Sequence, residues 1–162
     1  MADPIRTVAV LVANPALSSI LSMTLAGAPS LRVRPFDSQM ALKTYLRLAS
    51  ADIVVTDFDS EVARADLLAE DLRHDAAIQS RGLQIIALAS ALTTDAKAAS
   101  IHAGIDEIIM KPMSPKYLVE RVLVRLAKPK LPERRQRGLQ KRDWSAFGDN
   151  VVPLFRQAEP QH

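Results

Sequence analysis

The chain has 162 residues, 48% of them hydrophobic, with no cysteine and a formal net charge of +3. This composition predicts one globular domain with a sizeable core, and it excludes disulfides and cysteine-based zinc sites. No apolar stretch is long enough to span a bilayer, and the N-terminus lacks the pattern of a secretory signal, so we expect a cytoplasmic protein with no membrane association.

The charge is unevenly distributed along the chain. Residues 1–127 contain 13 Lys and Arg against 14 Asp and Glu, whereas residues 128–162 contain 8 against 4. Two prolines, Pro129 and Pro132, interrupt the last helical pattern at the same place. We therefore expect a domain over residues 1–127, followed by a basic, proline-containing and largely flexible tail over residues 128–162.

Strand patterns alternate with helical patterns throughout the predicted domain. In chain order, we predict a strand over 7–12, a helix over 15–26, a strand over 31–36, a helix over 38–49, a strand over 51–57, a helix over 61–77, a strand over 83–89, a helix over 94–103, a strand over 105–111 and a helix over 114–127. Most of these strands are apolar throughout, which is typical of strands that are buried on both faces. The pattern predicts a doubly wound α/β fold with a five-stranded parallel sheet.

Three polar side chains follow the ends of separate predicted strands. They are the carboxylate of Asp57, the hydroxyl of Ser90 and the ammonium of Lys111. The carboxyl ends of parallel strands meet at one edge of the sheet, where ligands bind in open α/β folds. A nucleophilic oxygen, a hydrogen-bond donor and a cation suit phosphoryl chemistry.

With these residues at these strand ends, the segment 5–127 resembles the receiver domain of bacterial two-component response regulators. The resemblance implies a flavodoxin-like fold. It also implies that Asp57 accepts a phosphoryl group from a sensor histidine kinase or a phosphotransfer protein, and that Ser90 and Lys111 contact the phosphoryl oxygens. A target protein is then expected to bind the face formed by the fourth helix, the fifth strand and the fifth helix.

The chain departs from that family at the metal site and at the switch. The family has an acidic pair that binds Mg²⁺ after the first strand, but this chain has Val12 and Ala13. Magnesium prefers carboxylate oxygens, so we expect its binding to be weak, and we expect no other cofactor. Asn14 and Asp59 are candidate substitutes, although Asp59 could instead interact with the dipole of the next helix. Ile108 stands at the family's aromatic switch position.

These departures leave two interpretations of the domain. The first is a single-domain atypical response regulator that relays a signal through protein contacts, with phosphorylation at Asp57 permitted but impaired. The alternative is a pseudo-receiver adaptor that works without phosphorylation, in which Lys111 forms an internal ion pair with Asp57. The 35 residues after Ala127, four of them proline, leave no room for a helix-turn-helix domain or an output enzyme, so we expect no enzymatic activity.

The basic tail allows a third interpretation. Arg134, Arg135 and Arg137, with Trp144 nearby, could bind a nucleotide or nucleic acid, or they could belong to a solvated tail that binds nothing specific. The apolar run 151–155 could dock on a partner or back on the domain.

Overall fold

The computed structural model describes residues 3–60, 64–80, 82–127 and 151–152. Its strands are β1 (Arg6–Leu11), β2 (Leu31–Phe36), β3 (Ile53–Asp57), β4 (Gln84–Ala89), β5 (Glu107–Met110) and β6 (Val151–Val152). Its helices are α1 (Pro15–Ala26), α2 (Gln39–Leu48), α3 (Ala65–His74), α4 (Thr94–Ala103) and α5 (Pro115–Ala127). The sheet order is β2-β1-β3-β4-β5-β6, and the first five of these strands are parallel, which confirms the predicted fold class.

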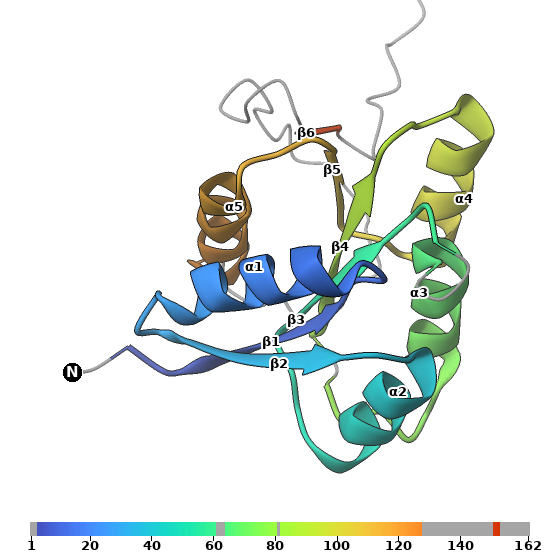
Figure 1. The fold of residues 1–162 in the computed structure, drawn as a ribbon. Helices are drawn as coiled ribbons and strands as arrows, with labels where there is room; N and C mark the ends of the chain where they lie inside the picture. Colours follow the sequence, from blue (N-terminus) through green and yellow to red (C-terminus); the bar gives the residue numbers. More distant parts are fainter. Residues whose placement is uncertain (1–2, 61–63, 81, 128–150, 153–162) are drawn as a thin grey trace, which may run out of the picture.

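Helices cover both faces of the sheet (Figure 1): α1 and α5 lie on one side, and α2, α3 and α4 lie on the other. Successive side chains of a strand point to opposite faces, so β1 contributes to two separate cores. Val8 and Val10 pack in the cluster with α1 and α5, whereas Ala9 and Leu11 pack in the cluster with α2 and α3. This burial on both faces explains why the central strands are apolar throughout.

Helix α3 is shorter than the predicted helix over 61–77. It begins at Ala65 and ends at His74, and residues 61–63 lie outside the described part of the chain. The backbone of Asp75 is extended, and its carboxylate accepts a hydrogen bond from the N–H of Ala77 at 2.9 Å. That bond, together with one from Arg47, lowers the pKa of Asp75. The prediction of its C-terminal end was wrong because this side-chain contact competes with the next helical turn.

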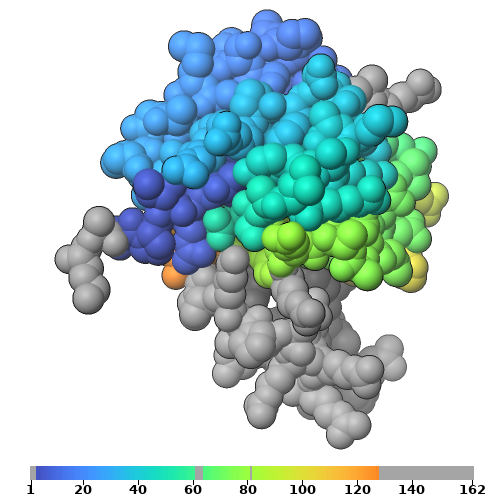
Figure 2. Space-filling model, turned by 90° about the horizontal axis from the view of Figure 1, so that it is seen from below, coloured from blue at the N-terminus to red at the C-terminus, as the bar shows by residue number. Residues whose placement is uncertain are grey.

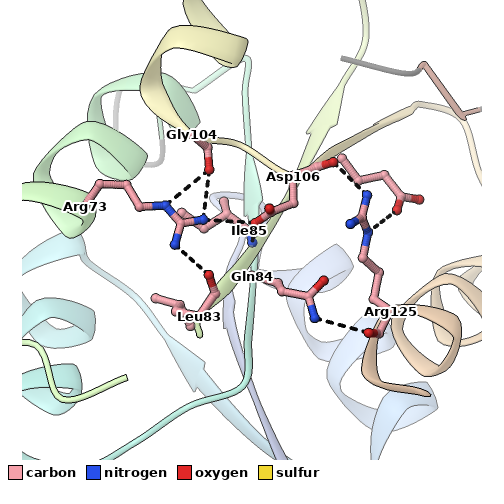
Figure 3. A network of polar contacts seen from close by, with 8 residues as sticks. Arg73, Leu83, Gln84, Ile85, Gly104, Asp106 and Arg125 are labelled. Carbon is pink, nitrogen blue, oxygen red and sulfur yellow. Dashed lines mark hydrogen bonds and ion pairs between the residues drawn. The ribbon is translucent and has the colours of Figure 1, made fainter. Parts of the chain in front are cut away.

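Arg73 of α3 donates hydrogen bonds to residues that lie just before β4 and β5 (Figure 3). Its guanidinium donates to the carbonyl of Leu83 at 2.6 Å, to that of Gly104 at 2.9 Å and to the carboxylate of Asp106 at 3.0 Å. Gly104 ends α4 in the left-handed region at φ 87°, and an added Cβ would lie 3.1 Å from the Arg73 side chain. Glycine is therefore required here by both its backbone conformation and the close approach of Arg73.

Two arginines of α5 meet a buried carboxylate on β5. Glu107, which is 1% exposed, accepts from Arg121 Nε at 2.6 Å and from Arg125 Nε at 2.5 Å. Arg125 also donates to the carbonyl of Asp106 at 2.7 Å, and its own carbonyl accepts from Gln84 at 3.1 Å (Figure 3). Arg73 and Arg125 thus hold the start of β5 from opposite faces of the sheet.

The two edges of the sheet are protected in different ways. At the β2 edge, Arg32 and Arg34 are exposed and Pro35 has no N–H to offer, features that discourage pairing with another strand. Viewed from below (Figure 2), the blue and cyan residues of the first third of the chain form a continuous surface, bordered by green residues.

At the other edge, β6 pairs antiparallel with β5. Ile108 is opposite Val152 and Ile109 is opposite Val151. The sequence analysis did not predict this strand, although it left open that the run 151–155 docks on the domain. Because β5 would otherwise expose backbone N–H and C=O groups, even a two-residue strand covers part of an edge suited to aggregation.

We predict that Glu107→Ala destabilises the fold by about 3 to 5 kcal/mol, because it leaves two buried guanidinium groups without their carboxylate. The measurement is the free energy of unfolding in urea. Glu120→Ala, which removes an exposed carboxylate from the same helix as the two arginines, is the control and is expected to change stability by no more than about 0.5 kcal/mol. Equal effects of the two substitutions would show that the buried cluster contributes no stability.

Candidate functional site

Asp57 is the last residue of β3, a central strand, and it is only 3% exposed. Its Oδ2 accepts a hydrogen bond from the backbone N–H of Ala13 at 2.8 Å, in the loop after β1. Its Oδ1 lies 2.9 Å from the ammonium of Lys111. Among the described residues, no donor is aligned with Oδ1 for a hydrogen bond, so the contact with Lys111 is an ion pair rather than a directed hydrogen bond. The burial of this carboxylate makes the nearby cation necessary.

Lys111 follows β5 and is held in place by its backbone. Its N–H donates to the carbonyl of Ala89 at 2.7 Å, which continues the pairing of β4 with β5, and its peptide bond to Pro112 is cis. Its ammonium lies 2.9 Å from Asp57 and 3.5 Å from Asp59, and the side chain is 23% exposed. One ammonium group therefore serves two carboxylates.

Asp59 connects the loops that follow β3 and β4. Its Oδ2 accepts a hydrogen bond from the backbone N–H of Ser90 at 2.6 Å and is the same oxygen that lies 3.5 Å from Lys111. The hypothesis that Asp59 interacts with the dipole of the next helix is wrong, because α3 begins at Ala65 and its first turn contains Asp66 instead. Ser90 itself is exposed, and it contributes its N–H to this cluster.

The loop after β1 provides no carboxylate to the site. Val12 is 4% exposed and packs in the apolar cluster with α1 and α5. Ala13 offers its backbone N–H, as described above. Asn14 caps α1, and its Oδ1 accepts from the N–H of Leu17 at 3.1 Å, so this oxygen already has a structural partner.

The carboxylates of this site are paired with an ammonium group of the protein itself. Magnesium demands near-octahedral coordination and is usually held by carboxylates, whereas Asp57 and Asp59 both face the ammonium of Lys111. Within the ranges that the structure describes, no three His, Cys, Asp or Glu side chains are grouped so that they could hold a metal ion.

The residue at the expected switch position lies in the core of the domain. Ile108 is fully buried and packs in the cluster with α2 and α3.

The tail residues proposed to bind anions, Arg134, Arg135, Arg137 and Trp144, lie outside the described residues. In the part of the chain that is described, no helix combines the length and the apolar character needed to cross a membrane.

Two of the groups that organise the site were missed by the sequence analysis. The N–H groups of Ala13 and Ser90 are backbone donors, which every residue except proline has. The amino-acid type at these two positions therefore gives no indication of this role. The N–H groups contact Asp57 and Asp59 because of the conformation of the two loops.

Comparison with solved structures shows that the chain has the response-regulator receiver fold. A response regulator from Thermotoga maritima has 21% identity and a TM-score of 0.65, with 76% of this chain and 99% of that chain covered. The chemotaxis response regulator CheY4 of Vibrio cholerae has 16% identity and a TM-score of 0.65, with 75% and 98% covered. The receiver domain of Francisella response regulator 1452 has 17% identity and a TM-score of 0.64, with 74% and 95% covered. No protein-family profile matches the sequence, and no curated protein matches it.

We predict that Lys111→Ala lowers the free energy of unfolding by about 2 to 3 kcal/mol, because it leaves the carboxylate of Asp57 buried without a cation. This figure is below that for a fully buried pair because Lys111 is partly open to water. Lys116→Ala removes an exposed ammonium group from α5 and is the control.

A double-mutant cycle identifies the partner. Asp57→Asn should restore most of the stability lost in Lys111→Ala, with a coupling energy above about 1 kcal/mol. Additive effects of the two substitutions would contradict an ion pair between these side chains.

Proposed function

We propose that this chain is a signalling protein of the receiver type, in which Asp57 accepts a phosphoryl group but does so poorly. The observation that carries the proposal is the buried carboxylate of Asp57, 2.9 Å from the ammonium of Lys111, at the carboxyl end of the central strand of a receiver fold. Ligands bind at this end of the strands in open α/β sheets.

In the proposed reaction, the phosphoryl donor is a phosphohistidine on a sensor kinase or phosphotransfer protein. A carboxylate oxygen of Asp57 attacks phosphorus, the new O–P bond forms as the P–N bond breaks, and the departing imidazole takes the electron pair and then a proton from solvent. Lys111 is positioned to stabilise negative charge on the phosphoryl oxygens. Catalysis of this kind depends on positioning and charge stabilisation, so the supply of cations limits its rate.

At this site, few positive charges are available to stabilise the phosphoryl oxygens. Lys111 faces two carboxylates, and the loop after β1 offers none to hold a magnesium ion. We therefore propose that Mg²⁺ binds weakly and that transfer to Asp57 is slow. We further propose that the protein has no enzymatic activity of its own and works in the cytoplasm.

The proposed output is a protein contact at the face formed by α4, β5 and α5. Leu123 and Val124 of α5 are 37% and 39% exposed, so this helix offers apolar surface to a partner. The β5 edge itself is paired with β6, which limits the part of this face that a target reaches.

A second candidate function is that of an adaptor that binds its partners without phosphorylation. Two observations favour it. The ammonium of Lys111 already gives the buried carboxylate of Asp57 a partner within the protein, and Ile108 is buried in place of the aromatic side chain that the receiver resemblance implies at this position.

We predict that acetyl phosphate modifies the wild-type protein slowly and with little dependence on Mg²⁺, because the metal lacks its carboxylates. Intact mass spectrometry over time measures the fraction that carries one phosphoryl group. Asp57→Asn should carry none.

The matched gain-of-function variant is Ala13→Asp, which adds one carboxylate at an exposed position beside Asp57. Val12→Asp is unsuitable because Val12 packs in the core. Ala13→Asp should react at least about tenfold faster, and only with Mg²⁺ present, since the added anion attracts the metal. Fast, Mg²⁺-dependent modification of the wild-type protein would contradict impaired transfer, whereas no modification of any variant would favour the adaptor.

A further inference from the structure

One carboxylate oxygen of Asp59 contacts two groups at the same time, a backbone N–H and a lysine ammonium. Oδ2 accepts from the N–H of Ser90 at 2.6 Å and lies 3.5 Å from the ammonium of Lys111. The hydrogen bond from the N–H of Ser90, at 2.6 Å to an ionised carboxylate, is of the strong, charge-assisted kind. An anion that approaches Asp57 from the end of the sheet would need these same two groups.

We infer that Asp59 is a resident anion that fills the phosphoryl-binding pocket of the resting protein, so that a phosphoryl group or free phosphate enters only when Asp59 leaves. The inference rests on the proposed function, because it concerns the pocket in which Asp57 would be modified. It assigns Asp59 the role of an internal competitor rather than that of a metal ligand.

The balance of charge supports competition. Asp57, Asp59 and Lys111 together carry two negative charges and one positive charge. A phosphoryl group carries about 1.5 to 2 negative charges at neutral pH, which is more than the single charge of the carboxylate that it modifies, and it needs hydrogen-bond donors for its oxygens. With Asp59 in place, both donors are engaged and the field at the pocket is repulsive.

Displacement of Asp59 is feasible because of where it lies. Its side chain is 33% exposed, so the carboxylate can turn into water without leaving a buried charge behind. Asp57 has no such freedom, since its side chain is 5% exposed and its Oδ2 is bound to Ala13. Of the two carboxylates on Lys111, Asp59 is therefore the one that yields to an incoming anion.

The test compares Asp59→Ala with wild type in the full chain, and Asp37→Ala is the control. Asp37 is exposed in the loop after β2, so its substitution removes the same charge at a distance from Lys111. Inorganic phosphate is the probe, titrated while the amide resonance of Ser90 is followed by NMR.

The inference predicts two changes in Asp59→Ala. The Ser90 amide proton moves upfield before phosphate is added, because its carboxylate acceptor is gone. Phosphate then shifts this resonance saturably, with an affinity at least about tenfold higher than in wild type or Asp37→Ala, as the loss of a competing charge implies. An unchanged Ser90 amide in Asp59→Ala would overturn the inference, as would equal phosphate affinity in Asp59→Ala and wild type or an equal gain in Asp37→Ala.

Modification by acetyl phosphate separates this inference from the proposed function. If Asp59→Ala binds phosphate at Ser90 but Asp57 is never modified, the proposed phosphorylation fails and the inference stands. If Asp57 is modified at equal rates in wild type and Asp59→Ala, and phosphate affinity is equal too, the inference fails and the proposed phosphorylation stands.

Discussion

The ammonium of Lys111 is the group on which the site depends. Asp57 ends a strand that is buried on both faces, so its carboxylate lies where an unpaired charge would be very costly. Within the described segments, its other partner is the N–H of Ala13, which is a dipole rather than a charge. The ammonium of Lys111 neutralises the charge of Asp57 and also contacts Asp59. Because one cation serves two carboxylates, little positive charge is left at the site for an incoming anion.

The rest of the fold places Lys111 by holding β5 at both ends. At its start, Glu107 is bound by two arginines of α5, and Arg73 reaches the preceding residues from α3 on the opposite face. At its end, the backbone of Lys111 pairs with Ala89 of β4. Since the strand has only four residues, a shift in its register would displace the ammonium from Asp57. The ion cluster at one end of the strand therefore supports the ion pair at the other.

Much of this arrangement is predictable because it follows from patterns along the chain. Apolar strands alternating with helical patterns predict the parallel sheet, and the parallel sheet brings the ends of β3 and β5 together, which places Asp57 near Lys111. What the sequence could not show depends on contacts between distant segments. The pairing of Val151–Val152 with β5 is set by the open edge of the sheet, not by any strong local strand pattern.

Charged residues were the hardest to place for a similar reason. Arg121 and Arg125 are four positions apart on α5 and, judged by residue type alone, would be assigned to its solvent face. They are buried because Glu107 lies opposite them on β5, within a run that looks like a purely structural strand. In the same way, the sequence offers Asp59 only as a candidate substitute for the missing acidic pair, and its contacts with Ser90 and Lys111 are visible only in the structure.

The most direct test of the account is an NMR spectrum of the lysine ammonium groups of the full chain, with Lys111 assigned through the variant Lys111→Arg. The account predicts a Lys111 ammonium signal that is protected from solvent exchange, is lost in Asp57→Asn and does not change when millimolar Mg²⁺ is added. A Lys111 ammonium that exchanges freely, or one that Mg²⁺ releases from Asp57, would contradict the claim that this lysine is the partner of the buried carboxylate.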